Sequence, residues 1–250
     1  PFTGADTIRK QNDFVYTIRA TYADEIEKII NFWGPLGISK VLVLHYEDEV
    51  GKQNFQTVAR ALVKFGQAPT ALAIKRNTDI TNENIKALIA ADPKIILATT
   101  LAGPIVQISK QLRMHNKPYP ITSLSFASLS QITKGLGADA AGITVSLTVP
   151  APNQREVPIV AECQDAWDAS KQAGPLTTTS LEACIAAKVL VESMRKAGKT
   201  VTRESLQRAL STMSKVDVGG FVMVFREGSH HGGVFVDIAV IRRNGAVRTS

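Results

Sequence analysis

The spacing of hydrophobic residues over positions 1–150 switches repeatedly between two patterns. Continuous apolar runs, such as residues 40–45 (KVLVLH) and 94–98 (KIILA), predict strands that are buried on both faces of a sheet. Between these runs, apolar residues recur at helical spacing, as at Ile26, Ile29 and Ile30. We expect strands near 14–18, 40–45, 68–74, 94–98, 119–124 and 141–147, and helices near 21–33, 51–65, 82–91, 102–116 and 128–136.

Strict alternation of strand and helix predicts right-handed βαβ units and therefore a doubly wound α/β lobe, whose parallel sheet is covered on both sides. The pattern changes after Pro150. Helices are expected over 157–173, 178–197 and 202–213, the last with Thr202 as its N-cap. Residues 220–225 and 234–243 have the composition of strands, and we expect them to pair as a terminal hairpin.

The composition narrows the class of protein. The 250 residues carry a formal net charge of +7, and 44% of them are hydrophobic, as in an ordinary globular protein. The basic residues are scattered, most of them singly, and no aromatic residues are interleaved with them, so we expect no nucleic-acid partner. No apolar run approaches the roughly 18 residues that a membrane span needs, so we expect no membrane insertion.

Signatures of cofactors and catalysis are missing from the sequence. It contains no Gly-x-Gly-x-x-Gly after a strand and no Walker loop, which argues against a nucleotide cofactor. His45 and His115 lie at element ends and His230 and His231 lie in a turn, unlike the i, i+4 pair of a helical zinc site. No nucleophile stands in a pattern that pairs it with a base. We expect no metal, no cofactor and no enzymatic activity.

Three strand ends carry residues that suit a ligand. These are residues 45–48 (HYED), 99–101 (TTL) and 123–126 (SLSF). Ligands of open parallel sheets bind beyond the carboxyl ends of the strands. Hydroxyls, carboxylates and aromatic rings at that edge predict a small polar ligand with an apolar part. The alternative interpretation is that these are ordinary loop residues.

The two cysteines, Cys163 and Cys184, fall within predicted helices that a Gly-Pro turn joins. Such helices pack antiparallel, so the two side chains can face each other. In an oxidising compartment they would form a disulfide. The alternative is a pair of small buried apolar side chains.

Several stretches resemble the branched-chain amino-acid-type (type I) periplasmic solute-binding proteins of ABC transporters. Their order and spacing carry the resemblance, which extends over essentially the whole chain. They are residues 14–24 (FVYTIRATYAD), 41–51 (VLVLHYEDEVG), 136–143 (LGADAAGI), 200–206 (TVTRESL) and 219–222 (GGFV) with the His-x-Gly turn that follows.

The resemblance implies a periplasmic binding protein type I fold, in which two α/β lobes are joined by three crossovers and close on a ligand. It also implies that the chain is amino-terminally truncated, with most of the first lobe absent. Residues 1–13 would be a remnant of the first lobe and 14–145 the second lobe. Residues 146–232 would return toward the first lobe, and 233–250 would supply the terminal strand of the second.

Site residues follow from the resemblance position by position. Thr3, Gly4 and Ala5 match the loop whose hydroxyl and backbone amides receive a ligand carboxylate. Val50 stands where amino-acid-binding relatives often have an aromatic residue, and no acid occupies the region of Ser125 where they pair the ligand's ammonium. A buried ammonium without a partner is costly, which favours a small organic acid over an amino acid. The expected ligand-binding residues are Thr3, Gly4, Ala5, Tyr46, Glu47, Val50, Thr99, Thr100, Leu101, Ser123, Ser125 and Phe126.

The implied function is that of a periplasmic receptor that captures its solute by hinge closure and delivers it to an ABC permease. Such a protein is made with a signal peptide. Two other classes of protein are open from the sequence alone. One is the effector-binding domain of a transcription regulator, and the other is a flavodoxin-like enzyme.

Overall fold

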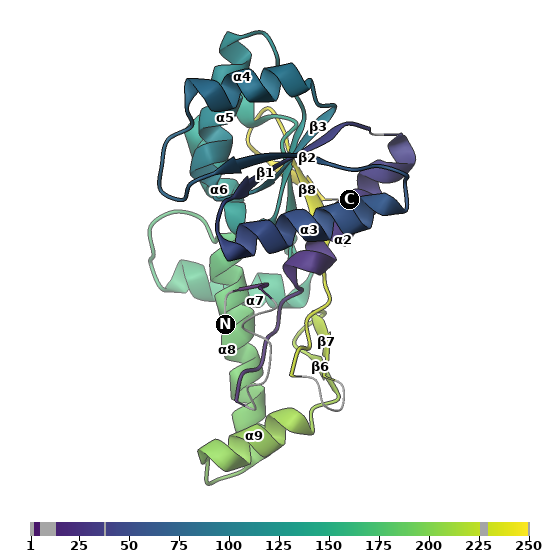
Figure 1. Ribbon diagram of the computed structural model, residues 1–250. Helices are drawn as coiled ribbons and strands as arrows, with labels where there is room; N and C mark the ends of the chain where they lie inside the picture. Colours follow the sequence, from purple (N-terminus) through teal and green to yellow (C-terminus); the bar gives the residue numbers. More distant parts are fainter. Residues whose placement is uncertain (1–2, 6–13, 38, 226–229, 250) are drawn as a thin grey trace. The chain divides into compact units, whose positions relative to one another are not determined.

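The computed structural model describes residues 3–5, 14–37, 39–225 and 230–249 (Figure 1). The chain divides into two compact units. Tyr22–Leu147 and Asp237–Ser250 form one, which we call the sheet unit. Pro1–Thr21 and Thr148–Val236 form the other, which we call the helical unit.

The sheet unit contains a seven-stranded sheet of order β2-β1-β3-β4-β5-β8-β9. Neighbouring strands from β2 to β5 pair in parallel, while β8 runs antiparallel to β5 and β9 antiparallel to β8. The strands are β1 (Val41–Tyr46), β2 (Thr70–Ile74), β3 (Ile95–Thr99), β4 (Ile121–Ser123), β5 (Thr144–Leu147), β8 (Asp237–Ile241) and β9 (Val247–Thr249).

Helices cover both faces of this sheet (Figure 1). On one face α2 and α3 pack in a hydrophobic cluster with Val43 and Leu97. The alternating neighbours Leu44 and Ile96 are also buried, on the face that α4, α5 and α6 cover. The helices are α2 (Tyr22–Trp33), α3 (Glu49–Val63), α4 (Asn82–Ala91), α5 (Ala102–Met114) and α6 (Leu129–Leu136), with 3-10 turns η1 (Gly34–Leu36), η2 (Ser125–Ala127) and η3 (Gly137–Ala140). The predicted doubly wound α/β fold is confirmed.

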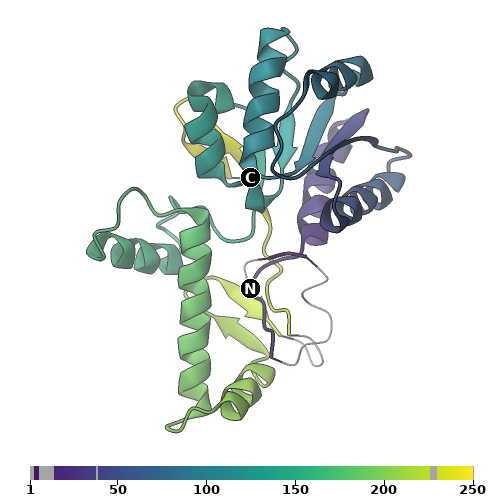
Figure 2. The same cartoon turned by 60° about the vertical axis from the view of Figure 1, so that its left-hand side comes forward.

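The helical unit packs three helices and a two-stranded antiparallel sheet (Figure 2). Its elements are α7 (Pro158–Ala169), α8 (Thr178–Ala197), α9 (Arg203–Ser211), β6 (Lys215–Asp217) and β7 (Val222–Val224). Ile159, Leu181, Ile185, Phe221 and Met223 are at most 2% exposed and form the centre of its core. Thr202 caps α9 as predicted, because its side chain accepts from the backbone N–H of Ser205.

The predicted terminal hairpin of residues 220–225 and 234–243 is wrong. β7 pairs instead with β6, through a turn in which Gly219 and Gly220 adopt φ values of 88° and 84°. β8 pairs with β5 on one side and with β9 on the other, through a turn that contains Gly245. The strands over 215–217 and 247–249 are only three residues long, too short to show an alternating pattern in the sequence.

The chain passes between the two compact units at 21/22, 147/148 and 236/237. Residues 14–21 belong to the helical unit, because Thr17 forms a parallel bridge with His231 and does not join the large sheet. The Thr17 amide donates to the His230 carbonyl, and the Gly232 amide donates to the Thr17 carbonyl. The apolar run at 14–18 is therefore held by two backbone hydrogen bonds and is not a sheet strand.

A buried ion pair ties this amino-terminal segment to α8. Arg19 and Glu182 are 4% and 6% exposed, and Arg19 Nη1 lies 3.5 Å from both carboxylate oxygens of Glu182. Thr148 Oγ1 also lies 3.5 Å from Glu182 Oε2. Arg19 and Thr148 lie next to the points at which the chain passes between the units, so Glu182 anchors both segments within the helical unit.

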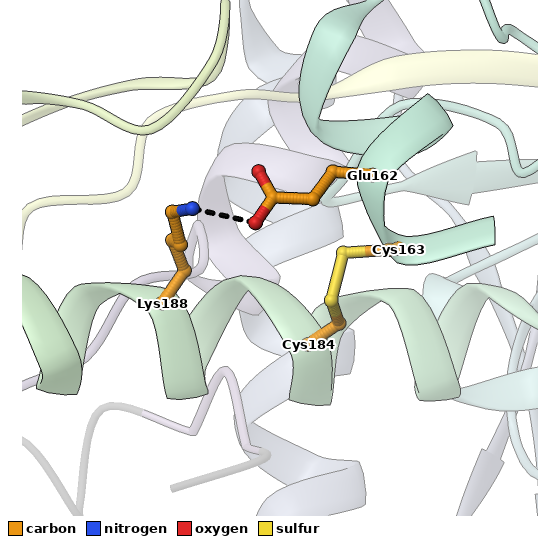
Figure 3. The surroundings of a disulfide bond; sticks show 4 residues. All are labelled: Glu162, Cys163, Cys184 and Lys188. Carbon is orange, nitrogen blue, oxygen red and sulfur yellow. Dashed lines mark hydrogen bonds and ion pairs between the residues drawn. A yellow bond between two sulfur atoms is a disulfide. The ribbon is translucent and has the colours of Figure 1, made fainter. Parts of the chain in front are cut away.

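A disulfide joins Cys163 on α7 to Cys184 on α8, with their Cα atoms 6.1 Å apart (Figure 3). Lys188 and Glu162 add an ion pair of 2.5 Å between the same two helices. A covalent bond between residues 21 positions apart restricts the unfolded chain, which favours the folded state.

We predict that the unreduced protein, unfolded in guanidinium chloride, has no thiol that reacts with a chromogenic disulfide reagent. Replacing both cysteines by serine is expected to lower the free energy of unfolding by about 3 kcal/mol, since a loop of this length is closed by the bond. Two reactive thiols per unreduced chain would contradict the disulfide.

Candidate functional site

The carboxyl ends of β1 to β4 meet along one edge of the sheet, because these strands are parallel. Tyr46 ends β1, Ile74 ends β2, Thr99 ends β3 and Ser123 ends β4. The ligand-binding residues predicted for the sheet unit lie at the ends of β1, β3 and β4 or within the next few residues of the chain.

Tyr46 links the loops that follow β1 and β3. Its side chain is 4% exposed, and its hydroxyl accepts a hydrogen bond of 3.2 Å from the backbone N–H of Leu101. Leu101 itself is 43% exposed, at the start of α5, where no side chain caps the helix. The Arg76 guanidinium stacks over the Tyr46 ring at 3.9 Å from its centroid. This part of the edge therefore presents an apolar side chain, an uncapped helix start and a cation.

Asp48 fixes the start of α3 and holds Arg76 in place. It accepts a hydrogen bond of 2.9 Å from the Gly51 amide, and its Oδ2 accepts from Arg76 Nε at 2.8 Å and Nη2 at 2.6 Å. Partial burial raises the pKa of Asp48, but the Gly51 hydrogen bond and the bonds and charge of Arg76 outweigh it, so the pKa lies below its ordinary value. A Cβ at Gly51 would collide with the Tyr46 carbonyl, so only glycine fits there.

Several predicted site residues are buried in the sheet unit. Thr99, Thr100 and Ser123 are at most 1% exposed. The Thr99 hydroxyl donates to the Leu44 carbonyl, and the Thr100 hydroxyl donates to the Leu101 carbonyl. Ser123 Oγ has no partner among the described residues. These three side chains support the edge from within, whereas Glu47 and Leu101 are exposed on it, and Val50 and Phe126 are partly exposed.

An acid does reach the region of Ser125, but it comes from α2. Glu25 is 0% exposed, and its carboxylate accepts hydrogen bonds from the Ser125 amide at 2.8 Å, the Ser125 hydroxyl at 3.0 Å and the Ser146 hydroxyl at 2.5 Å. Phe126 packs edge to face against Tyr22, with ring centroids 4.9 Å apart.

Thr3, Gly4 and Ala5 lie in the helical unit. The Ala5 amide donates to Thr3 Oγ1 at 3.2 Å, which closes a local turn. Gly4 and Ala5 are buried, and Thr3 is partly exposed.

Sequence reasoning missed Arg76 and Glu25. Arg76 lies two residues beyond β2, at the same edge as the ends of β1, β3 and β4. The signal for it was its place just after a strand of the predicted parallel sheet. Glu25 lies in the first turn of the helix predicted over 21–33, and its position beside Ile26 and Ile29 places it on the buried face. An acid on an apolar helix face was the available signal.

Two features were sought in residues 3–5, 14–37, 39–225 and 230–249, the part of the chain that the structure describes. These residues contain no group of three or more histidine, cysteine or acidic side chains that could hold a metal ion. None of the helices in those ranges has both the length and the hydrophobicity required to cross a bilayer.

The family model described as periplasmic binding protein matches residues 2–246 of the chain. The chain belongs to this family. The predicted type I solute-binding fold is therefore confirmed, and the protein is a solute-binding protein and not an enzyme. No curated protein sequence matches the chain.

Solved structures of several other proteins share the fold. A substrate-binding periplasmic protein from Ralstonia solanacearum is 30% identical, with a TM-score of 0.90 over all of this chain and 72% of its own. A fatty acid ABC transporter substrate-binding protein from Thermomonospora curvata is 17% identical, with a TM-score of 0.86 over all of this chain and 66% of its own. A branched-chain amino acid ABC transporter protein from Thermus thermophilus with bound valine is 14% identical, with a TM-score of 0.82 over all of this chain and 70% of its own.

The role of Asp48 gives a prediction for this binding protein. We expect D48A to lower the free energy of unfolding by about 1 kcal/mol at pH 7, because it removes the N-cap of α3. D48N should cost less, since asparagine caps a helix equally well.

The pH dependence of this difference follows from the sign of the pKa shift. Folding lowers the pKa of Asp48, so its ionised form stabilises the protein at pH values above the unfolded-state pKa of about 3.9. This stabilisation is lost as the pH falls through the lower pKa of the folded state. Urea unfolding of wild type and D48A should therefore converge below about pH 4. An equal difference at pH 3 and pH 7 would contradict this account of Asp48.

Proposed function

We propose that this protein is a periplasmic receptor that captures a small carboxylate-bearing solute by hinge closure and delivers it to an ABC permease. The observation that carries the proposal is that β1, β3 and β4 are parallel neighbours, so Tyr46, Leu101 and the Ser125–Phe126 turn lie at the same edge of the sheet. The hydrogen bond from the Leu101 amide to the Tyr46 hydroxyl joins two of the loops at this edge. Open parallel sheets bind their ligands at this edge.

The charges around the edge bear on the class of solute. Glu25 has its carboxylate buried under Ser125 and Ser146, so it does not offer a charge to an ammonium group. Asp48 already binds Arg76. This supports a small organic acid, aromatic acids included, as the ligand. Within the sheet unit, its carboxylate would be received at the uncapped start of α5, at Leu101.

An amino acid is the second candidate ligand. Glu47 is exposed at the end of β1 and could pair with an ammonium group. Of the similar solved structures, one contains valine and another is named for fatty acids. Both are carboxylates, which is the chemistry common to the two candidates.

A thermal-shift assay of the full-length protein tests the proposal. The probes are benzoate, 4-hydroxybenzoate, L-leucine and L-phenylalanine, and benzamide and benzyl alcohol serve as controls that lack the carboxylate. A ligand at 1,000 times its Kd stabilises the folded state by about 4 kcal/mol, which for a protein of this size raises Tm by about 10 °C. A shift with a carboxylate and none with its matched control is the expected result.

A variant pair then locates the binding. L101D places a negative charge at the exposed start of α5 and should weaken carboxylate binding by about tenfold or more. M114D makes the same kind of change at the other end of α5, where Met114 is 76% exposed, and should leave affinity unchanged. The proposal is wrong if no carboxylate raises Tm, or if L101D binds as tightly as M114D.

A further inference from the structure

Glu25 is a charged side chain at a position where the helix pattern calls for an apolar one. It lies in the first turn of α2, on the face that buries Ile26, Ile29 and Ile30. A carboxylate without exposure to water is costly unless hydrogen bonds compensate for its lost hydration. Its oxygens accept from Ser125 N, Ser125 Oγ and Ser146 Oγ at 2.5 to 3.0 Å, the range of strong charge-assisted bonds.

The residues that Glu25 holds belong to the predicted binding edge. Ser125 opens the 3-10 turn Ser125–Ala127, which begins two residues after β4 ends and has no side-chain cap of its own. The next residue, Phe126, packs on Tyr22, which lies one helical turn before Glu25 on α2. The first turn of α2 thus contacts Ser125 through the Glu25 carboxylate and Phe126 through the Tyr22 ring.

The backbone after this turn is in an unfavourable conformation. Ser128, the residue that follows the turn, has φ 57° and ψ 99°. A non-glycine residue at positive φ persists only where the surrounding contacts determine it. The short segment between β4 and α6 therefore depends on contacts from outside itself, and Glu25 supplies hydrogen bonds at its start.

We propose that Glu25 is a positioning residue for the solute: through Ser125 and Ser146 it holds the Ser125–Phe126 turn in the conformation that binds ligand, without touching the ligand itself. This inference rests on the proposed function for the part that concerns ligand affinity. The part that concerns the conformation of the turn does not depend on ligand binding, because it is argued from the hydrogen bonds of Glu25.

The part that concerns the turn is tested without a ligand by amide hydrogen exchange of E25Q. A glutamine turns one acceptor oxygen into a donor, so it cannot accept from all three groups. We expect the Ser125 amide to exchange about tenfold faster or more than in wild type, because its acceptor becomes at best a neutral amide oxygen, and a hydrogen bond to a charged acceptor is stronger than one to a neutral acceptor. The amides of β3 should be unchanged. E27Q, at an exposed position of the same helix, is the matched control and should exchange as wild type does. Unchanged protection of Ser125 in E25Q would overturn the proposal.

Ligand affinity separates positioning from mere support of the fold. Benzoate and L-leucine are titrated calorimetrically into wild type, E25Q, S146A and L88A, where Leu88 is a buried residue of α4. We expect L88A to lose stability and keep its affinity, and E25Q to lose affinity by about tenfold or more. S146A, which removes one donor, should show a smaller loss and serves if E25Q does not fold.

The outcomes of the two assays are distinguishable. If E25Q binds the probe as tightly as wild type, Glu25 does not position the site. If wild type binds neither probe, the proposed class of solute is wrong, whereas the exchange of Ser125 still decides whether Glu25 holds the turn.

Discussion

Parallel pairing is the constraint on which the rest of this structure depends. Parallel strands need a crossover between each pair, so their carboxyl ends all lie at one edge and helices cover both faces. All six residues of β1 and all five of β3 are buried as a result. Exposed polar groups such as Glu47 lie beyond the strand ends, and residues far apart in sequence, such as Tyr46 and Leu101, meet at this edge.

Buried charges are the second determinant, and each compact unit contains an example. In the sheet unit Glu25 is satisfied by hydroxyls and an amide, and in the helical unit Glu182 faces Arg19 and Thr148. A buried charge stabilises a protein little, but it restricts the arrangement of the groups that satisfy it, because losing one partner is expensive. Glu25 contacts the η2 turn, and Glu182 contacts Arg19 and Thr148, which lie beside the points where the chain passes between the units.

The sequence predicted the helices and the long strands well, because each has a periodicity visible within one element. The helices over 82–91 and 178–197 have the predicted limits. Pairing could not be predicted for β6, β7 and β9, because strands of three residues contain no register of their own and pair according to the turns and neighbours around them.

The candidate site was predicted in part. The strand ends that carry Tyr46, Thr99 and Ser123 do lie at one edge, yet whether a hydroxyl there faces a ligand or the core depends on packing, which the sequence does not show. The role of Glu25 depends on Ser125 and Ser146, about 100 and 121 residues away along the chain. Contacts at that separation follow only from the tertiary structure.

The central claim is that a solute binds at the carboxyl edge of the sheet. Amide chemical-shift mapping by NMR of the full-length protein, titrated with the carboxylate that gives the largest thermal shift, tests it most directly. The account predicts that the largest changes in the sheet unit occur at residues 46–50, 99–103 and 124–127. Changes concentrated at the opposite edge, around residues 118–121 and 139–143, with none at the carboxyl ends, would contradict it.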